Sequence, residues 1–316
     1  MIVLGFDIGG TKSAVILAEE INGEILFHDR VEIKTTVNWE SVIDELIDIG
    51  KKMLNQINVH YDNFKIGISC GGPLDSDKGV IISPPNLPGW ENVPIADYIY
   101  KRLGVRPKLQ NDADACALAE WKYGIGRGYK NIIFLTFGTG LGAGLILNGQ
   151  LYKGANNMAG EGGHIRLKDE GPLGYGKRGS FEGFCSGGGI AQIAKKKAYD
   201  LDKNGLKASF LKDNIENITA KDVAEAAEMD SKDALDVFKI SGKYFGRGLA
   251  ILIDILNPEL IIVGSIYVRS GKFLNDTMYR ELEREALKFS RSIVQIVPAQ
   301  LGEQIGDYGA VVAALS

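Results

Sequence analysis

The sequence predicts an α/β protein with two lobes related by duplication. Strand-like apolar runs alternate along the chain with segments of helical spacing, the order typical of α/β folds. Residues 132–147 also repeat the hairpin pattern of residues 2–17. The chain has 40 glycines in 316 residues, where about 22 would be usual, and many lie in the turns of the two repeats. We therefore expect a small lobe at 1–112 plus 302–316 and a large lobe at 113–301.

The small lobe begins with a glycine-lined hairpin. Apolar runs at 2–6 and 13–17 flank the turn DIGGTK at 7–12. Asn22–Gly23 is a type I′ turn signal, and the alternating residues 24–33 predict a third strand. The remaining elements predicted in this lobe are a helix from Val42 to Ile57, a buried strand at 65–70, a Gly- and Pro-rich loop at 71–90, a helix from Pro94 and a strand at 107–110; an Ala-rich helix at 113–123 then begins the large lobe.

The second repeat is a similar hairpin, with GTG at 138–140 in its turn and Asn148–Gly149 as the next type I′ signal. Spacing then predicts further elements in the large lobe: helices at 187–199, from Ala220 and at 232–256, and a strand at 260–263. The Ala-rich end, 302–316, is expected to be helical.

Charge and composition exclude several classes of protein. The net charge is −4, from 36 basic and 40 acidic residues, whereas a dedicated nucleic-acid binder carries a basic surface. The first residues lack a signal-peptide pattern and no long apolar stretch occurs, so we expect a cytoplasmic protein that does not bind membranes. Cys70, Cys116 and Cys185 have no CxxC spacing, which indicates reduced, buried thiols.

The two glycine turns predict a phosphate site. Amides of a tight glycine turn can converge on an anion, although a single turn such as 9–12 would be equally typical of plain hairpin geometry. Two turns at equivalent positions of duplicated lobes suit a polyphosphate held from two sides. Neither turn is a Walker loop or a dinucleotide fingerprint, because both motifs need a helix that begins at the glycines.

Two carboxylates follow predicted strands. Asp7 is placed to hold Mg²⁺ through water near phosphates, and capping of the turn amides is the alternative. Asn111 and Asp112 precede a helix, where an N-cap is the simplest interpretation. Transfer of a phosphoryl group to an alcohol needs one carboxylate to accept the hydroxyl proton, and Asp112 can supply it. Asp114, two residues later, should point to another side of the helix.

A third group of polar residues suits a polyhydroxyl ligand. Glu161 and His164 lie among glycines at 159–164, and Glu182 follows in GSFEGF. A single histidine is more often structural than a ligand, and that is our interpretation of His28 and His60.

These motifs together resemble those of ROK-family sugar kinases, in the superfamily of actin, hexokinase and the heat-shock ATPases. The resemblance covers nearly the whole chain: DIGGTK at 7–12, GPLD at 72–75, PNLPGW at 85–90, NDADACALAE at 111–120, TFGTGLGAG at 136–144, AGEGGH at 159–164 and IVGS at 262–265. It implies two actin-like (ribonuclease H-like) lobes with a nucleotide cleft between them. It also implies ATP and Mg²⁺ as cofactors and a homodimer or homotetramer, while the small net charge given above is the reason to expect no nucleic-acid partner.

The resemblance assigns roles to individual residues, with Asp112 as the catalytic base and Asp7 at the magnesium ion. The phosphate-binding residues would be Gly9, Gly10, Thr11, Lys12, Gly138, Thr139, Gly140 and Gly264, with Ser265 where a second glycine is more usual. The sugar-binding residues would be Gly72, Asn86, Asn111, Asp112, Glu161, His164 and Glu182.

One motif of the family is missing. The family commonly follows its histidine with CxCGxxGCxE, a zinc motif, and here Leu173, Tyr175 and Ser180 stand in place of the three cysteines. A structural zinc ion needs about four ligands, so we predict no zinc. Packing and glycine turns must then hold this loop in place of a metal ion. The Tyr175 side chain is a candidate for that packing.

The predicted reaction is ATP-dependent phosphorylation of glucose to glucose 6-phosphate. N-Acetylmannosamine kinases of the family tend to have Arg where Pro73 stands, which favours glucose as the substrate. Fructose, N-acetylhexosamines and other hexoses are the alternative substrates. The less favoured alternatives are a non-catalytic sugar sensor and an ATPase without a sugar acceptor. Because the first phosphate motif begins at Asp7, a repressor with a DNA-binding domain before it is not expected.

Overall fold

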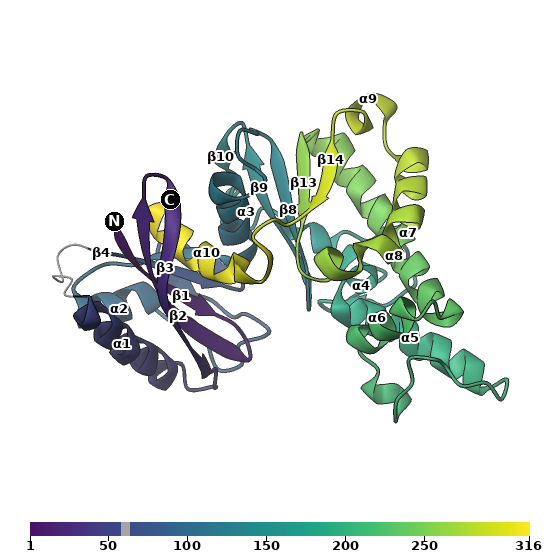
Figure 1. Cartoon of the computed structure of the whole chain (residues 1–316), viewed down its shortest axis with the longest axis horizontal. Coiled ribbons are helices and arrows are strands. Elements are labelled where there is room, and N and C mark those ends of the chain that lie inside the picture. The colour runs from purple at the N-terminus through teal and green to yellow at the C-terminus, as the bar shows by residue number, and fades with distance from the viewer. Residues whose placement is uncertain (58–63) are drawn as a thin grey trace. The chain divides into compact units, whose positions relative to one another are not determined.

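The computed structural model describes residues 1–57 and 64–316, so His60 lies outside the described residues. The chain divides into two compact units (Figure 1). The first unit comprises residues 1–130, 144–159 and 300–316, and the second comprises 131–143 and 160–299.

The first sheet has the strand order β3-β2-β1-β4-β7. Strands β1 (Ile2–Ile8), β2 (Lys12–Ile21) and β3 (Glu24–Lys34) are antiparallel, and β4 (Phe64–Cys70) and β7 (Lys108–Asn111) continue the sheet parallel to β1. Asn22 and Gly23 both have positive φ, 53° and 82°, which confirms the predicted type I′ turn.

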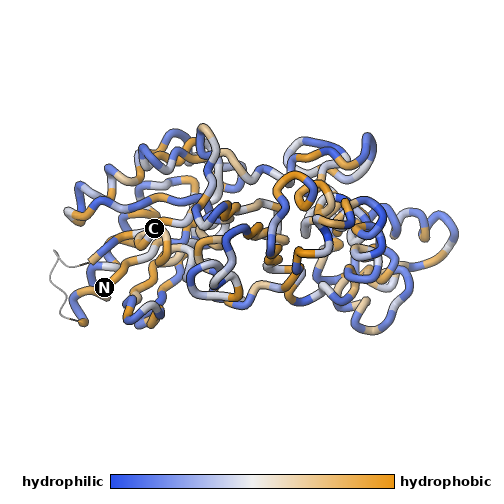
Figure 2. Tube along the Cα trace, turned by 90° about the horizontal axis from the view of Figure 1, so that it is seen from above, coloured by the Kyte–Doolittle hydropathy of each residue, from blue (hydrophilic) through white to orange (hydrophobic). Residues whose placement is uncertain are grey.

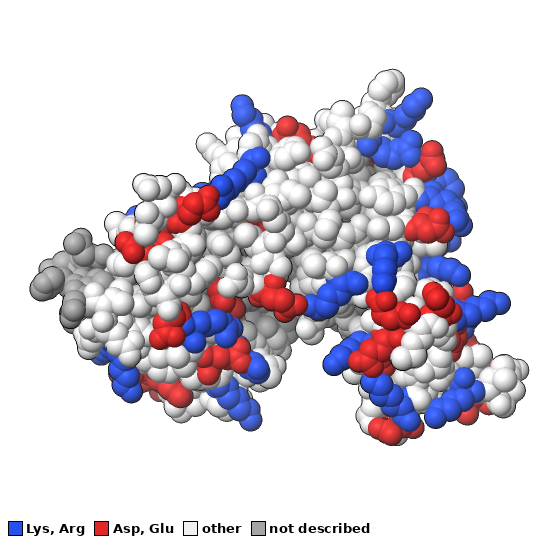
Figure 3. Space-filling model, in the orientation of Figure 1, with Lys and Arg blue, Asp and Glu red and all other residues white. Residues whose placement is uncertain are grey.

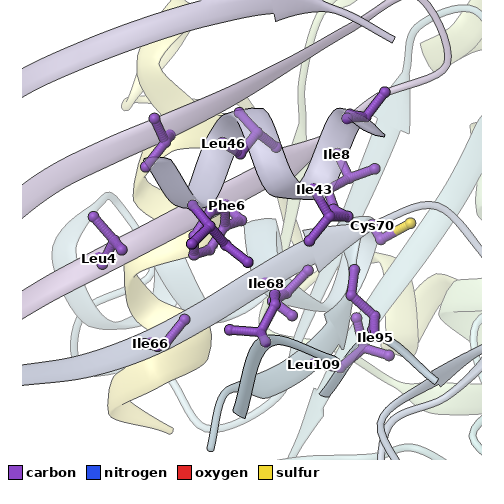
Figure 4. Close-up of a cluster of buried hydrophobic side chains, with 14 of the residues drawn as sticks. Leu4, Phe6, Ile8, Ile43, Leu46, Ile66, Ile68, Cys70, Ile95 and Leu109 are labelled. Carbon is purple, nitrogen blue, oxygen red and sulfur yellow. The ribbon is translucent and has the colours of Figure 1, made fainter. Parts of the chain in front are cut away.

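Helices cover both faces of this sheet. Alternate residues of β1 point to opposite faces: Leu4, Phe6 and Ile8 belong to one apolar cluster with Ile43 and Leu46 of helix α1 (Trp39–Gln56) (Figure 4). Helix α2 (Ile95–Leu103) adds Ile95 and Ile99 to the same cluster.

The opposite face is covered by the C-terminal helix α10 (Ile305–Leu315), which also packs on α3 (Asp112–Tyr123). Its Ala310, Val311 and Ala314 form a second cluster with Val3 and Ile16. The two ends of the chain therefore contribute to one core.

The second sheet has the order β10-β9-β8-β13-β14. It is built from β8 (Ile132–Phe137), β9 (Leu141–Leu147), β10 (Gln150–Leu151), β13 (Leu260–Val263) and β14 (Gln295–Pro298), with β13 parallel to β8 and β14. The hairpin strands thus lie on one side of β8 and the parallel strands on the other, as around β1. This shared plan confirms the predicted duplication.

The helices of the second unit are α4 (Phe181–Phe184), α5 (Gly187–Asp202), α6 (Ala220–Glu228), α7 (Lys232–Leu256), α8 (Ile266–Glu285) and α9 (Lys288–Arg291). The predicted helices at 187–199, from Ala220 and at 232–256 are confirmed. Helix α8 and strand β14 are not predicted by the sequence pattern, because the buried side of α8 includes Ser270, Gly271 and Glu281, which weakens the apolar periodicity.

The smaller elements are β5 (Leu74–Asp75), β6 (Val80–Ile81), β11 (Leu173–Gly174), β12 (Lys177–Arg178) and the 3₁₀ turns η1 (Glu161–His164), η2 (Ile215–Asn217) and η3 (Gly302–Gln304). Of these, η1 carries Glu161 and His164 of the predicted sugar site, and the β11–β12 hairpin carries Tyr175 of the segment that lacks the zinc motif.

The surface is mixed in polarity and sign. Hydrophilic and hydrophobic residues alternate along the trace (Figure 2), and none of the helices in the described ranges has the length and apolar character to cross a bilayer. On the face shown in Figure 3, basic and acidic side chains are interspersed, consistent with the small net charge.

Candidate active site

In the first unit, the predicted carboxylates Asp7 and Asp112 lie at the carboxyl ends of the parallel strands β1 and β7. Asp7 is near the carboxyl end of β1, and Asn111 ends β7. Parallel pairing aligns Ile8 with Cys70 and Cys70 with Asn111. The carboxyl ends of parallel strands are where α/β proteins usually bind ligands.

Asn111 is the residue that caps helix α3. Its Oδ1 accepts hydrogen bonds from the amides of Ala113 (3.0 Å) and Asp114 (3.4 Å). Asp112 Oδ1 accepts from the amide of Ala113 (2.8 Å), and the backbone amide of Asp112 itself is the other donor to this carboxyl. The cap is therefore supplied by the neighbour, which leaves the Asp112 carboxylate available for chemistry.

The Asp112 carboxylate has the environment of a proton acceptor. Solvent reaches the residue, yet the surrounding protein desolvates the carboxyl enough to raise its pKa, against the lowering effect of the backbone amide of Ala113. Asp114 is buried instead, and its Oδ2 accepts from Gln110 Nε2 at 3.0 Å.

Two glycines of the 71–90 loop lie close to three polar residues predicted to bind the sugar. A Cβ added at Gly71 would lie 3.4 Å from Asn86 Oδ1 and 3.8 Å from Asp112 Oδ2, and one at Gly72 would lie 3.1 Å from Asn111 Nδ2. The side chains of Asn86, Asn111 and Asp112 thus surround one glycine pair.

The first glycine turn adjoins the same loop. A Cβ on Gly10 would collide with the Asn86 carbonyl, so only glycine allows this approach. Gly9 N donates to Lys12 O at 3.1 Å, whereas the amides of Gly10 and Thr11 have no partner among the described residues. The Lys12 ammonium lies 2.6 Å from Glu32.

Asp7 is crowded by other carboxylates. Burial, together with the negative charges of Asp307 and Asp112, raises its pKa to about 7, and Arg30 partly offsets them. Arg30 Nε donates to Asp307 Oδ1 at 2.9 Å. No donor hydrogen-bonds to the Asp7 side chain within residues 1–57 and 64–316.

The second glycine turn lies in the second unit. Gly138 N donates to Gly140 O at 3.0 Å, and Gly138 O accepts from Gly187 N at 2.7 Å. Glu182 Oε2 accepts from Leu141 N at 3.0 Å. The predicted sugar ligand Glu182 therefore also supports the predicted phosphate turn.

The turn at Gly264 also reaches Gly138. Ser265 has φ 53° and ψ −112°, a conformation in which a residue other than glycine costs about 1–3 kcal/mol. A Cβ added at Gly138 would lie 3.4 Å from the Ser265 hydroxyl oxygen. Ser265, and with it the turn at Gly264, thus lies beside the predicted phosphate-binding residue Gly138.

Glu161 and His164 lie on η1, beside Glu182. A Cβ on Gly163 would lie 3.4 Å from Glu182 Cβ, and it would collide with the Leu141 carbonyl. Glu161 and His164 are exposed, and Glu182 is half-buried. The three predicted sugar-binding residues of the second unit therefore share one region.

The residues present do not fit the zinc ion of the family motif. Leu173, Tyr175 and Ser180 offer no thiolate, and Cys185 is buried with its Sγ 3.5 Å from Ser241 O. Among the described residues, no group of three or more His, Cys, Asp or Glu side chains is placed to hold a metal ion directly.

A sequence model described as the ROK family matches residues 3–316. The chain belongs to the ROK family. A glucokinase of Streptomyces coelicolor is 30% identical over 312 residues, which is 98% of this chain and 96% of the relative. A ROK glucokinase of Streptomyces griseus, crystallised with glucose and AMPPNP, has a TM-score of 0.79 and 29% identity over 100% of this chain and 99% of that one.

The ROK family also contains regulators. A xylose repressor of Caldicellulosiruptor bescii is 29% identical over 83% of this chain and 65% of its own length. The predicted membership and the actin-like two-lobe fold are confirmed by the family match and the solved ROK kinases.

Sequence reasoning missed two features of the site. Asp307 beside Asp7 carries no sequence signal, because it starts an apolar C-terminal helix. The start of α5 beside Gly138 does carry a signal, the glycine run 187–189, although the sequence pattern predicts only that a helix begins there.

Proposed function

We propose that this ROK protein is a glucokinase that transfers the γ-phosphoryl group of ATP to the 6-hydroxyl of glucose. The protein is a sugar kinase, as its glucokinase relatives indicate. The glucose and AMPPNP bound to the Streptomyces griseus enzyme support the choice of substrates.

The observation that carries the proposal is the position of the Asp112 carboxylate. It is solvent-accessible and adjacent to the Asn86 amide, and Asn111 rather than Asp112 caps the helix. In the proposed reaction Asp112 accepts the proton of the sugar 6-hydroxyl. The sugar oxygen then bonds to the γ-phosphorus, the bond to the β,γ-bridging oxygen breaks, and ADP leaves.

The other predicted residues bind and orient the two substrates. Amides of the turns at 9–12 and 138–140, together with Gly264, would hold phosphates, a role supported by the unpaired amides of Gly10 and Thr11. Asn111 and Gly72 complete the sugar side near Asp112, and the ring hydroxyls would be held by Asn86, Glu161, His164 and Glu182.

Asp7 fits a hydrated divalent cation. Its carboxylate has no hydrogen-bond donor among the described residues, and the nearby charges of Asp112 and Asp307 favour a compensating cation. A Mg²⁺ ion there would neutralise charge on the phosphates of ATP. Because residues 1–57 and 64–316 contain no group of three or more metal-binding side chains, contact through water is favoured.

The decisive test is the Asp112→Ala variant. Because the carboxylate accepts a proton only during transfer, we expect kcat to fall by about two to four decades while glucose affinity changes little. ADP release is measured with glucose and ATP, and glucose affinity by calorimetry. Asp97→Asn, an exposed carboxylate on α2, is the control. Unchanged turnover in Asp112→Ala would reject the base assignment.

A panel of hexoses assayed with the wild-type protein tests the substrate. The proposal predicts the highest kcat/KM for glucose among glucose, fructose, mannose and N-acetylhexosamines. A higher value for another hexose would replace glucose as the substrate. Glucose binding without turnover would identify a sensor, and sugar-independent ADP release an ATPase.

A further inference from the structure

We propose that Tyr175 is a positioning residue that orients the His164 imidazole for sugar binding, in place of a metal ion. The inference rests on the proposed function, since it assumes that His164 contacts the sugar. It is carried by the contacts between η1 and the β11–β12 hairpin, all within the second unit.

The first observation is a ring contact. The centroids of the His164 and Tyr175 rings lie 6.1 Å apart with an interplanar angle of 73°, an edge-to-face arrangement that aromatic pairs prefer. Both residues are exposed, so the ring contact restrains an imidazole that would otherwise rotate freely. The Tyr175 hydroxyl has no hydrogen-bond partner in the described part of the chain, which leaves the ring itself as the contacting group.

The hairpin that carries Tyr175 is fixed to the second unit. Gln192 of α5 holds Leu173 at both backbone groups: Leu173 N donates to Gln192 Oε1 and Gln192 Nε2 donates to Leu173 O, each at 2.8 Å. At the other strand, Lys177 Nζ donates to the His164 carbonyl at 2.8 Å. Tyr175 is therefore held in place at the tip of an anchored hairpin.

The turn itself does not favour tyrosine at position 175. Among the described residues, three two-residue hairpin turns have positive φ at both positions, and two of them are Asn22–Gly23 and Asn148–Gly149. The third is Tyr175–Gly176, with φ 42° and 74°. Asn tolerates this conformation better than Tyr, so the turn geometry alone would favour Asn at 175.

This comparison supplies a variant that keeps the hairpin. Tyr175→Asn places the preferred turn residue at the tip and removes the ring, while Tyr175→Phe keeps the ring and removes the hydroxyl. Loss of an orienting contact weakens substrate binding more than the chemical step, so for Tyr175→Asn we expect the KM for glucose to rise about three- to tenfold with kcat within about twofold. Tyr175→Phe should retain the wild-type KM.

A second measurement, by NMR, reports on the His164 imidazole directly. The chain has three histidines, so the imidazole Cε1–H signal of His164 can be assigned by NMR with a His164→Gln variant. We expect this signal to move in Tyr175→Asn, because the ring current is lost, and to stay near its wild-type position in Tyr175→Phe. Tyr100→Asn, an exposed tyrosine on α2, is the control for both measurements.

Three results would overturn the inference: an unchanged KM in Tyr175→Asn, a raised KM with an unmoved His164 signal, or an equal loss in Tyr175→Phe. Failure of the proposed function would give a different set of results. If the wild-type protein does not phosphorylate glucose, the substrate assignment fails, while the NMR comparison still tests the contact between Tyr175 and His164.

Discussion

At the scale of single residues, two carboxylates at one sheet edge have different environments. Asp112 is open to solvent and its neighbour Asn111 supplies the helix cap. Asp7 lies deeper, close to Asp307 and without a hydrogen-bond donor among the described residues. The first environment suits proton transfer, and the second suits a cation.

The pH dependence of stability follows from Asp7. Its pKa is about 7 in the folded protein, against an ordinary 3.8. Between these values the unfolded chain releases this proton while the folded protein retains it, so ionisation of Asp7 destabilises the fold as pH rises from about 4 to 7.

We therefore expect Asp7→Asn to gain stability relative to wild type as pH rises. The gain between pH 5 and pH 8 should be on the order of 3 kcal/mol. Urea unfolding of both proteins at the two pH values, without nucleotide or divalent cations, measures it. Parallel pH profiles would show that Asp7 has an ordinary pKa.

At the scale of elements, the C-terminal helix α10 packs closely on the first sheet because two strands carry glycine. A Cβ on Gly5 would lie 3.1 Å from Ala310 Cβ, and one on Gly67 would collide with the Ala310 carbonyl and the Ala314 amide. Since Asp307 is on α10, this packing also sets its distance to Asp7.

Gly67→Ala tests that close approach. Overpacking at backbone atoms that cannot move aside should lower the free energy of unfolding by about 1–3 kcal/mol. Lys65→Ala, an exposed position on the same strand β4, should change it by less than about 0.5 kcal/mol. Equal effects of the two substitutions in urea unfolding would contradict the role given to Gly67.

The helices and strands also show which parts of the fold the sequence patterns predict. Strong periodicity predicts α7, and turn chemistry predicts the hairpins at Asn22–Gly23 and Asn148–Gly149. Helix α8 is not predicted because its buried face includes polar and small residues, and β14 is not predicted because none of its four residues is buried, so it lacks the apolar run that identifies β13. Such elements are stabilised by packing against neighbours distant in sequence.

At the scale of the whole molecule, the chain repeats one plan in two five-stranded sheets and belongs to the ROK family. In the segment around Tyr175 it lacks the three cysteines of the CxCGxxGCxE motif. Its three cysteines are buried, and burial raises the pKa of each thiol well above the ordinary value, which disfavours the thiolate that zinc requires.

We expect the purified protein to contain less than about 0.1 zinc ion per chain, because a structural site needs about four ligands. Elemental analysis of protein produced in zinc-supplemented medium measures this ratio. Pretreatment with a chelator followed by removal of the chelator should also leave glucose phosphorylation unchanged. One zinc ion per chain that survives dialysis would contradict the prediction.

The sequence by itself determined the duplicated hairpins, the glycine turns and the position of Asp112 at a strand end, because each depends on residues that are neighbours along the chain. Tertiary structure decided which residue caps α3, how close Asp307 comes to Asp7, and that the Tyr175 ring contacts His164. Those contacts join segments whose approach depends on side-chain volume and packing, which local sequence patterns do not encode.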